Sequence, residues 1–293
     1  MKTVLIAGGC GLIGKHLQKR LTAKGYKVYS LTRRAKARGQ IYWDPQKQTF
    51  ESKHLDEVNV IINLAGANIG EKRWSEQRKI ELHESRIQAT NFLFLLTKHM
   101  PNLEYYVGAS GVNCYETDGC IHKEEDVFGK DFLSQLVKDW EQASFSFQQK
   151  CKVAVLRTAV VLTSNGGSMD KMLGPIKWGI GSALGNGKQH MPWIHLEDIC
   201  NMYIFAIENK LEGAYNAVAD NTPNKVFMQQ LAKTVKRPFF FPAVPAFVLK
   251  MALGEMSWLV LSDLQASNEK IKNVGFEFAF PNLEYALKNL LVD

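Results

Sequence analysis

The 293-residue sequence predicts an α/β fold, with a doubly wound parallel sheet and a smaller, mostly helical C-terminal region. A short apolar run at 3–7 is followed by a glycine cluster, helical apolar spacing over 12–23 and a β-rich run at 27–32. Apolar runs then alternate with helical stretches for about 160 residues, which is typical of parallel strands covered by helices. After Leu162 this alternation gives way to glycine-rich loops.

The expected elements follow each other in the order of βαβ units. Gly25 ends the first helix, and the second strand begins at once, as a crossover between parallel strands requires. Further strands are expected at 58–64, 105–109 and 153–156, with helices at 74–99 and 131–149. A helix at about 196–208 and a strand at about 213–218 return to the first domain, and a final amphipathic helix is expected at 285–291.

Composition and cysteine spacing exclude several classes of protein. With 46% apolar and 22% charged residues the chain has the balance of a globular protein, and it contains no run of eighteen apolar residues. We therefore expect no membrane partner. Five widely spaced cysteines without a CxxC pair argue against a disulfide framework and against a zinc site. No metal and a cytoplasmic location are expected.

The net charge of +7 lies in one segment. Residues 1–43 hold ten Lys or Arg and no Asp or Glu, so the remaining 250 residues sum to 7 − 10 = −3. Such a segment suits a small anionic ligand, a nucleic acid or simply a solvated face. Much of it lies on the helix whose start would face phosphates in the interpretation below. We therefore expect no nucleic-acid partner.

The sharpest motif is Gly8-Gly-Cys-Gly11-Leu-Ile-Gly14, between the first strand and the first helix. Gly8 allows the tight turn, Gly11 lets the backbone approach a pyrophosphate, and Gly14 lets the helix pack close to the strand. The phosphates then lie at the helix N-terminus, where free N–H groups and the helix dipole favour negative charge. The motif predicts a Rossmann-type dinucleotide site, with Leu12 and Ile13 also at the cofactor.

The end of the second strand favours NADP over NAD. An acidic residue there would accept a hydrogen bond from the ribose 2′-hydroxyl, whereas an arginine would pair with a 2′-phosphate. This sequence has Thr32, Arg33 and Arg34 at the strand end, and no carboxylate precedes Asp44, which is expected in a Trp-Asp-Pro turn. The alternative for the two arginines is solvent exposure without a ligand.

Short motifs follow in order along nearly the whole chain, among them Asn63-Leu-Ala-Gly66, Arg73-Trp74, Ser85-Arg86, Ala109-Ser110, Trp140-Glu141, Leu156-Arg-Thr158, Trp193-Ile-His195 and Gly254-Glu-Met256. Through them the sequence resembles the extended short-chain dehydrogenase/reductases, and within these the atypical NAD(P)-dependent epimerase/dehydratase-like family with a C-terminal domain of unknown function, DUF1731. Members are often labelled nucleoside-diphosphate-sugar epimerase-like or cell-division-inhibitor-like. The resemblance implies an NADP-binding protein and adds Leu64, Ala65 and Gly66 to the expected cofactor contacts.

The chain departs from the superfamily in its catalytic pair. The superfamily's chemistry needs a tyrosine and a lysine four residues later, so that the ammonium lowers the tyrosine pKa and the phenol exchanges a proton during hydride transfer. None of the nine tyrosines has a lysine at that spacing, and Leu133 and Val137 occupy the expected positions. The resemblance leaves Ser110 and Tyr115 as candidate catalytic residues. Tyr115 would then need another group, such as Lys130 or the nicotinamide, to lower its pKa.

Candidate substrate contacts are Arg73, Trp74, Lys188 and Gln189. An arginine, an aromatic plane and a flexible glycine loop suit an anionic or ring-bearing ligand. The competing interpretation of the first two is a core tryptophan beside a surface arginine. His195 could transfer protons near neutral pH, as histidines often do. Its position at the start of the helix expected at about 196–208 favours a structural hydrogen bond instead.

These observations divide the chain into an NADP-binding Rossmann domain at 1–165, with return elements at about 196–220, substrate-region segments at 166–195 and 221–244, and a small C-terminal module at 245–293. The apolar surface of this module would cover the substrate region or pair with a second subunit in a homodimer.

Two functions remain open. The first is an NADP-dependent oxidoreductase or epimerase acting by hydride transfer on a small, nucleotide-linked or other, substrate. The second is an NADP-binding sensor or regulatory protein with little or no turnover, because the Tyr/Lys pair is missing.

Overall fold

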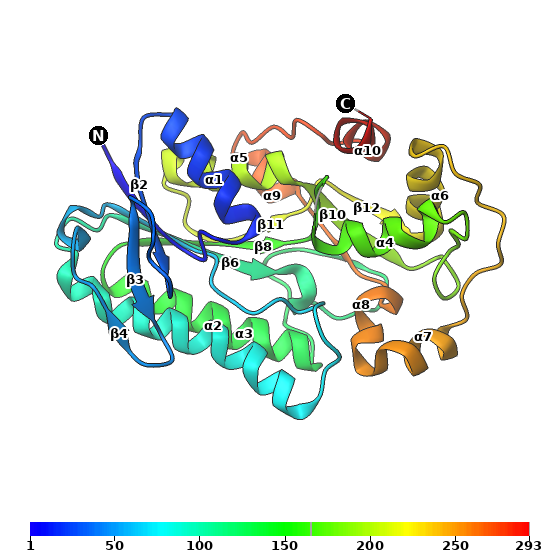
Figure 1. Cartoon of the computed structure of the whole chain (residues 1–293), viewed down its shortest axis with the longest axis horizontal. Coiled ribbons are helices and arrows are strands. Elements are labelled where there is room, and N and C mark those ends of the chain that lie inside the picture. The colour runs from blue at the N-terminus through cyan, green and yellow to red at the C-terminus, as the bar shows by residue number, and fades with distance from the viewer. Residues whose placement is uncertain (165, 293) are drawn as a thin grey trace.

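An eight-stranded sheet forms the centre of the molecule, in the order β11-β8-β6-β5-β1-β2-β3-β4 (Figure 1). The computed structural model describes residues 1–164 and 166–292. All neighbouring strands pair in parallel except β3 and β4, which are antiparallel. The strands are β1 (Thr3–Ala7), β2 (Lys27–Thr32), β3 (Gln40–Asp44), β4 (Thr49–Phe50), β5 (Val60–Asn63), β6 (Tyr105–Gly111), β8 (Lys152–Thr158) and β11 (Gly213–Ala217).

Helices cover both faces of this sheet. One face carries α1 (Leu12–Ala23) and α5 (Leu196–Asn209), and the other carries α2 (Glu76–Leu96) and α3 (Phe132–Phe145) (Figure 1). Strands β1 and β5 are buried along their whole length, as strands with helices on both faces must be. The predicted doubly wound α/β fold is therefore confirmed. Short 3-10 helices lie at Leu55–Glu57, Thr97–His99, Val112–Cys114, Ser146–Gln149 and Gly254–Ser257.

The chain runs outward from the middle of the sheet in two directions. From β1 it proceeds to β2 and β3 on one side, and from β5 to β6, β8 and β11 on the other. The strand order therefore reverses between β1 and β5. In such sheets ligands bind in the crevice outside the carboxyl ends of the strands at this reversal. This crevice is where the glycine turn after β1 and the segment after β5 meet.

The stretch after Leu162 is more regular than the sequence suggested. It contains α4 (Gly167–Lys177) and a second sheet of three strands, in the order β12-β10-β9. The glycines and Pro175 of α4 are poor helix formers, but its buried Met169, Leu173 and Ile176 have helical spacing and hold it against the fold. The remaining elements are β9 (Val160–Leu162), β10 (His190–His195), β12 (Asp220–Pro223) and α6 (Asn224–Thr234).

The C-terminal segment divides into a surface part and a core part. No residue of α7 (Ala246–Leu253) or of the following α8 (Trp258–Leu261) is buried. From Leu264 onward the chain joins the main core, to which Ile271, Phe276 and Leu287 belong. The elements of this part are β13 (Gln265–Ala266), which pairs with β7 (Ile121–His122), α9 (Glu269–Asn273) and α10 (Leu283–Leu291).

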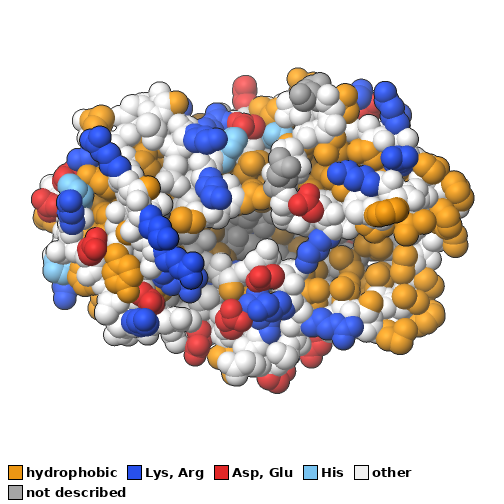
Figure 2. Space-filling view, viewed as in Figure 1, with side chains coloured by type: hydrophobic (Ala, Val, Ile, Leu, Met, Phe, Trp, Pro, Cys, Tyr) orange, Lys and Arg blue, Asp and Glu red, His pale blue; other side chains and the backbone are white. Residues whose placement is uncertain are grey.

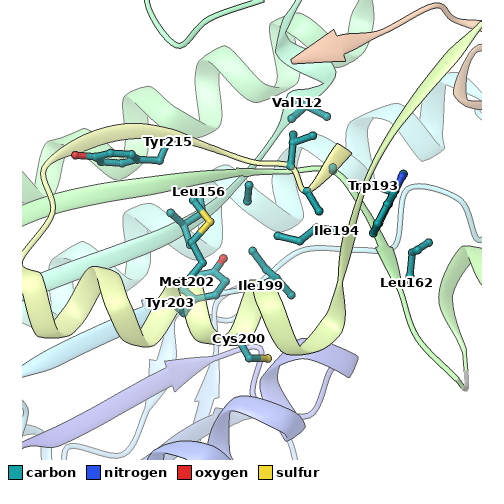
Figure 3. Packing of buried hydrophobic residues seen from close by; sticks show 14 of the residues in the cluster. Val112, Leu156, Leu162, Trp193, Ile194, Ile199, Cys200, Met202, Tyr203 and Tyr215 are labelled. Atoms are coloured by element: carbon teal, nitrogen blue, oxygen red, sulfur yellow. The ribbon is translucent and has the colours of Figure 1, made fainter. Parts of the chain in front are cut away.

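The main core lies between the central sheet and α5. Ile199, Met202 and Tyr203 of α5 pack toward Leu156 of β8, with Trp193 of β10 at one end of the cluster (Figure 3). The carboxylate of Asp198 accepts hydrogen bonds from the amides of Ala279 and Phe280, at 2.7 and 2.9 Å, and so ties α5 to the C-terminal segment. No helix in the described part of the chain is long and apolar enough to span a membrane.

Candidate functional site

The glycine turn after β1 is held by close backbone packing. Gly8 has a φ of +78°, and a Cβ there would lie 2.7 Å from the carbonyl group of Leu64. A Cβ on Gly14 would lie 2.5 Å from the Gly8 oxygen, so only glycine lets α1 approach the turn this closely. Gly11 is exposed, and a Cβ there would meet only the Gly8 oxygen, at 3.2 Å. The turn therefore presents backbone on its outer side.

The start of α1 has the features of an anion site. Gly11 is the N-cap residue and offers no side chain to the first amides, and the first turn contains no acidic residue. Leu12 and Ile13 follow, both partly buried. The free N–H groups and the helix dipole favour a negative group there. A pyrophosphate therefore fits this cradle, where a larger residue at Gly11 would project into the space.

The end of β2 adds positive charge beside this cradle. The Cys10 thiol lies 3.9 Å from the Thr32 hydroxyl, so the glycine turn and the end of β2 are neighbours. Arg33 and Arg34 are exposed, and their guanidinium groups have no hydrogen-bond or ion-pair partner in the described part of the chain. The Asp44 carboxylate instead accepts from the amides at 46 and 47, at 3.1 and 3.3 Å, and so closes the turn expected there.

The segment after β5 forms the other wall of the crevice. Leu64 donates its amide to Ala7, at 2.9 Å, and the Ala65 amide donates to Asn63, at 3.2 Å. Gly66 is exposed and lies against the buried Arg86, because a Cβ on Gly66 would be 3.1 Å from that side chain. Burial lowers the pKa of Arg86 to about 10. The structure thus brings the predicted cofactor residues of β1, β2 and β5 to one edge of the sheet.

Ser110 belongs to a buried network of hydrogen bonds. Its hydroxyl donates to Glu141 of α3, at 2.5 Å, and Arg157 of β8 donates to both oxygens of the same carboxylate, at 2.8 and 2.9 Å. Burial alone would lower the pKa of Arg157, but its hydrogen bonds to Glu141 raise it above the ordinary value. The charge of Arg157 is therefore permanent, and the Ser110 hydroxyl is already engaged.

Tyr115 is part of the same network and is fully buried. Its hydroxyl donates to Asn216, at 2.7 Å, and accepts from Arg157, at 2.8 Å. Burial raises the pKa of this phenol well above its ordinary value. An acid/base role required the opposite shift, and Lys130 is not among the groups that alter this pKa. A catalytic role of Tyr115 therefore stays a prediction, in which the nicotinamide would have to lower this pKa.

The sequence reasoning missed Glu141 and Arg157 as partners of these residues. In the sequence both stand out only as parts of family motifs. A signal was present, because an arginine inside the apolar run of β8 must find a buried acceptor. Ser110 and Arg157 are direct neighbours in the pairing of β6 and β8. The carboxylate between them could not be placed without knowing how α3 packs.

Three of the four predicted substrate residues make side-chain hydrogen bonds to other described residues. Arg73 donates to the carbonyls of Met251 and Ala252, and so holds the C-terminal end of α7. Trp74 is buried and donates to Ile69, at 3.0 Å, but its ring lines a cavity described below. Gln189 is buried and donates to Leu184 and Val260, both at 2.9 Å, whereas Lys188 is exposed. Their contact with a substrate remains a prediction.

His195 has the structural role expected from its position. It is the N-cap residue of α5, where its Nδ1 accepts a hydrogen bond from the Glu197 amide at 3.1 Å. Its ring stacks on Phe280 with the centroids 3.9 Å apart. Burial lowers the pKa of His195 to about 4. The imidazole is therefore neutral near pH 7 and caps the helix as an acceptor.

A cavity of about 470 Å³ lies between the start of α3 and the C-terminal helices. Its walls include Trp74, Phe132 and Leu133 on one side and Lys250 and Trp258 on the other. Leu133 is the position at which the superfamily would carry its tyrosine. Figure 2 shows this face hollowed at its centre, with Lys and Arg side chains beside the hollow and hydrophobic side chains gathered over α7 and α8.

The fold and the glycine turn define a nicotinamide-dinucleotide-binding protein of the Rossmann type. The NAD-dependent epimerase/dehydratase family matches residues 4–218, and a domain of unknown function, DUF1731, matches residues 244–290. The chain belongs to this epimerase/dehydratase family and carries that C-terminal domain.

Relatives of similar length cover almost the whole chain. It is 33% identical to the mouse epimerase family protein SDR39U1 over 98% of this chain and 99% of the relative, and 33% identical to YfhF of Bacillus subtilis over 99% and 98%. The crystal structure of human SDR39U1 with NADPH superposes with a TM-score of 0.90 at 30% identity and covers 99% of both chains. A UDP-N-acetylglucosamine 4-epimerase from Bacillus cereus, at 15% identity and a TM-score of 0.79, shares the fold.

Proposed function

We propose that this protein binds NADP(H) and transfers hydride between the nicotinamide and a small-molecule substrate held in the neighbouring cavity. The observation that carries the proposal is the joint geometry of the glycine turn and the end of β2. The turn offers a pyrophosphate an acid-free helix N-terminus, and Arg33 and Arg34 follow beside it with no partner for their guanidinium groups among the described residues. The NADPH in the related human structure supports the same cofactor.

The proposed contacts divide the cofactor among three loops. Gly8, Gly11 and the start of α1 would hold the pyrophosphate, Thr32 to Arg34 the adenosine 2′-phosphate, and Leu64 to Gly66 the rest of the cofactor across the crevice. Bound there, the cofactor supplies the hydride chemistry. The residues of this chain would bind and orient it, and the cavity beside Leu133 would hold the substrate.

The buried network bears on how the reaction could proceed. With Leu133 and Val137 in place of the tyrosine and lysine, no phenol stands free at the start of α3, and the hydroxyls of Ser110 and Tyr115 are engaged with Glu141, Asn216 and Arg157. We assign these two residues to holding β6, β8 and α3 in register. Proton transfer would then come from the substrate itself or from water.

The same observation favours a second candidate function. A protein that binds NADP(H) tightly, and whose described part has no free phenol at the start of α3, suits a sensor that reports the cofactor's redox state. Steady-state oxidation of NADPH with a broad panel of carbonyl substrates distinguishes the two. Turnover supports the oxidoreductase, and tight NADPH binding without turnover on any member supports the sensor.

Cofactor choice is tested by Arg33→Ala. Loss of one charge-assisted contact should cost about 1.5–3 kcal/mol, which is roughly a 10- to 150-fold rise in the Kd for NADPH. The Kd for NADH should change little. Calorimetry with both cofactors measures this, with Lys150→Gln, an exposed lysine on the loop before β8, as the control. Equal losses for both cofactors would remove the assignment of Arg33 to the 2′-phosphate.

A further inference from the structure

We propose that the cavity between α3 and the C-terminal helices takes a substrate with a planar, apolar body and a single acidic group, and that Lys250 is the residue that binds this group. The inference rests on the proposed function, because it names the substrate class for that site. It excludes nucleotide sugars.

The walls of the cavity favour an apolar ring system. Trp74 and Phe132 contribute one side, with their rings in an edge-to-face contact at 5.6 Å between centroids. Trp258 and Leu261 contribute the opposite side from α8. A volume of about 470 Å³ suits a molecule of two or three fused rings or of similar bulk, and aromatic walls bind such planar surfaces well.

The charges of the lining leave one free cation. The Asp131 carboxylate caps α3, where it accepts from the amides of Leu133 and Ser134 at 2.8 and 3.0 Å. Glu255 pairs with Lys79, at 2.6 Å. The ammonium of Lys250 has no hydrogen-bond or ion-pair partner in the described part of the chain. A bound acid would therefore meet one ammonium without an ion-pair partner in the described part of the chain, in a lining that also holds the Asp131 carboxylate.

This balance does not suit a nucleoside diphosphate. Its two phosphates are commonly held by several cationic donors or by arginine forks. Arg73 is the arginine next to Trp74 in the sequence. Its guanidinium donates hydrogen bonds to the carbonyls of Met251 and Ala252. That contact fixes the end of the helix that carries Lys250, so Arg73 acts as a positioning residue here. One lysine in a cavity lined by two tryptophans matches a carboxylate or sulfonate on an apolar body.

Two free hydroxyls supply polar contacts to such a ligand. Thr117 and Ser257 line the cavity, and neither hydroxyl makes a hydrogen bond within the described part of the chain. The neighbouring Ser262 hydroxyl, by contrast, donates to the Trp258 carbonyl at 2.5 Å. Because Leu133 also borders the cavity, a carbonyl or hydroxyl on the ligand's body would face the position where the superfamily performs its chemistry.

Calorimetric titration of the full chain, with and without saturating NADPH, tests the proposal with three probes. They are 2-naphthoate, its neutral counterpart 2-naphthamide, and UDP-glucose. Naphthoate should bind at least about tenfold more tightly than naphthamide, because only the acid meets the charge of Lys250. Lys250→Gln should remove this difference. Trp258→Ala should weaken both naphthalene probes by a similar factor, and Lys150→Gln should change neither.

The outcomes distinguish a wrong substrate class from a wrong proposed function. If the chain binds NADPH but neither naphthalene probe, or if UDP-glucose binds more tightly than naphthoate in a manner that depends on Lys250, the substrate class is wrong while the proposed function stands. If naphthoate binding is indifferent to Lys250→Gln, the lysine is not the anchor and the proposal also falls. Failure to bind NADPH, measured in the same titrations, would instead remove the proposed function.

Discussion

Gly11 and Gly14 belong to one motif, yet their surroundings predict different consequences of substitution. A side chain at Gly14 would collide with the Gly8 backbone at 2.5 Å, whereas a side chain at Gly11 would project outward from an exposed position. One glycine therefore serves the packing of α1 on β1. The other leaves space for a ligand.

We predict that Gly11→Val abolishes NADPH binding and leaves a folded protein, while Gly14→Val lowers the melting temperature sharply. The valine at 11 would occupy the space that a pyrophosphate needs, and the one at 14 would force α1 away from the turn. Circular dichroism and calorimetry on both variants make the comparison. If Gly11→Val binds NADPH with native affinity, the turn has a structural role only.

His195 gives a prediction about pH. The pKa of His195 is about 4 in the folded protein and about 6.5 when the side chain is exposed. Between these pH values the unfolded chain binds a proton at His195 and the folded chain does not. The resulting stability is present above pH 6.5 and is lost as the pH falls toward 4, by about 3 kcal/mol at most.

His195→Asn keeps an N-cap acceptor for α5 and removes this titration. Urea unfolding at pH 7 and pH 4.5 should therefore show a smaller loss of stability for the variant than for the natural chain. An identical loss in both proteins would show that the folded His195 takes up its proton as readily as the unfolded one.

A part of the site could be predicted from the sequence when its arrangement depends on residues that are close together in the chain. This holds for the glycine turn and for Arg33 at the end of the second strand. Ser110 and Tyr115 are surrounded by groups from α3, β8 and β11, and their environment appears only when the sheet is assembled. Their hydroxyls could be named from the sequence, but their engagement could not.

Among the strands and helices, the sequence predicted those whose own residues show an apolar run or helical apolar spacing. Strand β3 was missed because it is short, follows a loop with three arginines and one lysine, and runs directly into Pro45. Strand β10 was missed because it contains Pro192 and polar ends. Its pairing with both β9 and β12 is what defines it as a strand. Tertiary pairing supplied what local propensity lacked.

The ion pair between Glu141 and Arg157 joins α3 to β8, and we predict that Glu141→Gln destabilises the protein by about 3–5 kcal/mol. Both side chains are buried, so the variant leaves the arginine charge without a counter-ion. Replacing both together, as Glu141→Leu with Arg157→Met, should cost less than Glu141→Gln alone. Denaturant unfolding of the three proteins gives the comparison. A cost below 1 kcal/mol for Glu141→Gln would mean that the pair does not hold these elements together.

For the whole molecule, the question is whether the C-terminal segment can be separated from the rest. The sequence suggested a small C-terminal module at 245–293, distinct from the NADP-binding domain. The described structure shows that only the part before Leu264 lies outside the main core. Asp198 of α5 also depends on the amides of Ala279 and Phe280 for its hydrogen bonds.

We predict that deleting residues 264–293 abolishes cooperative unfolding and NADPH binding together, because Ile271, Phe276 and Leu287 complete the core around α5 and α6. Changing Phe247 and Met251 to serine on α7, where they are 69% and 73% exposed, should leave stability within about 0.5 kcal/mol of the natural value. Thermal unfolding and calorimetry with NADPH are the measurements. A truncated chain that still unfolds cooperatively and binds NADPH would show that the first 263 residues form an independent domain. The core of the Rossmann part would then close without its C-terminal helices.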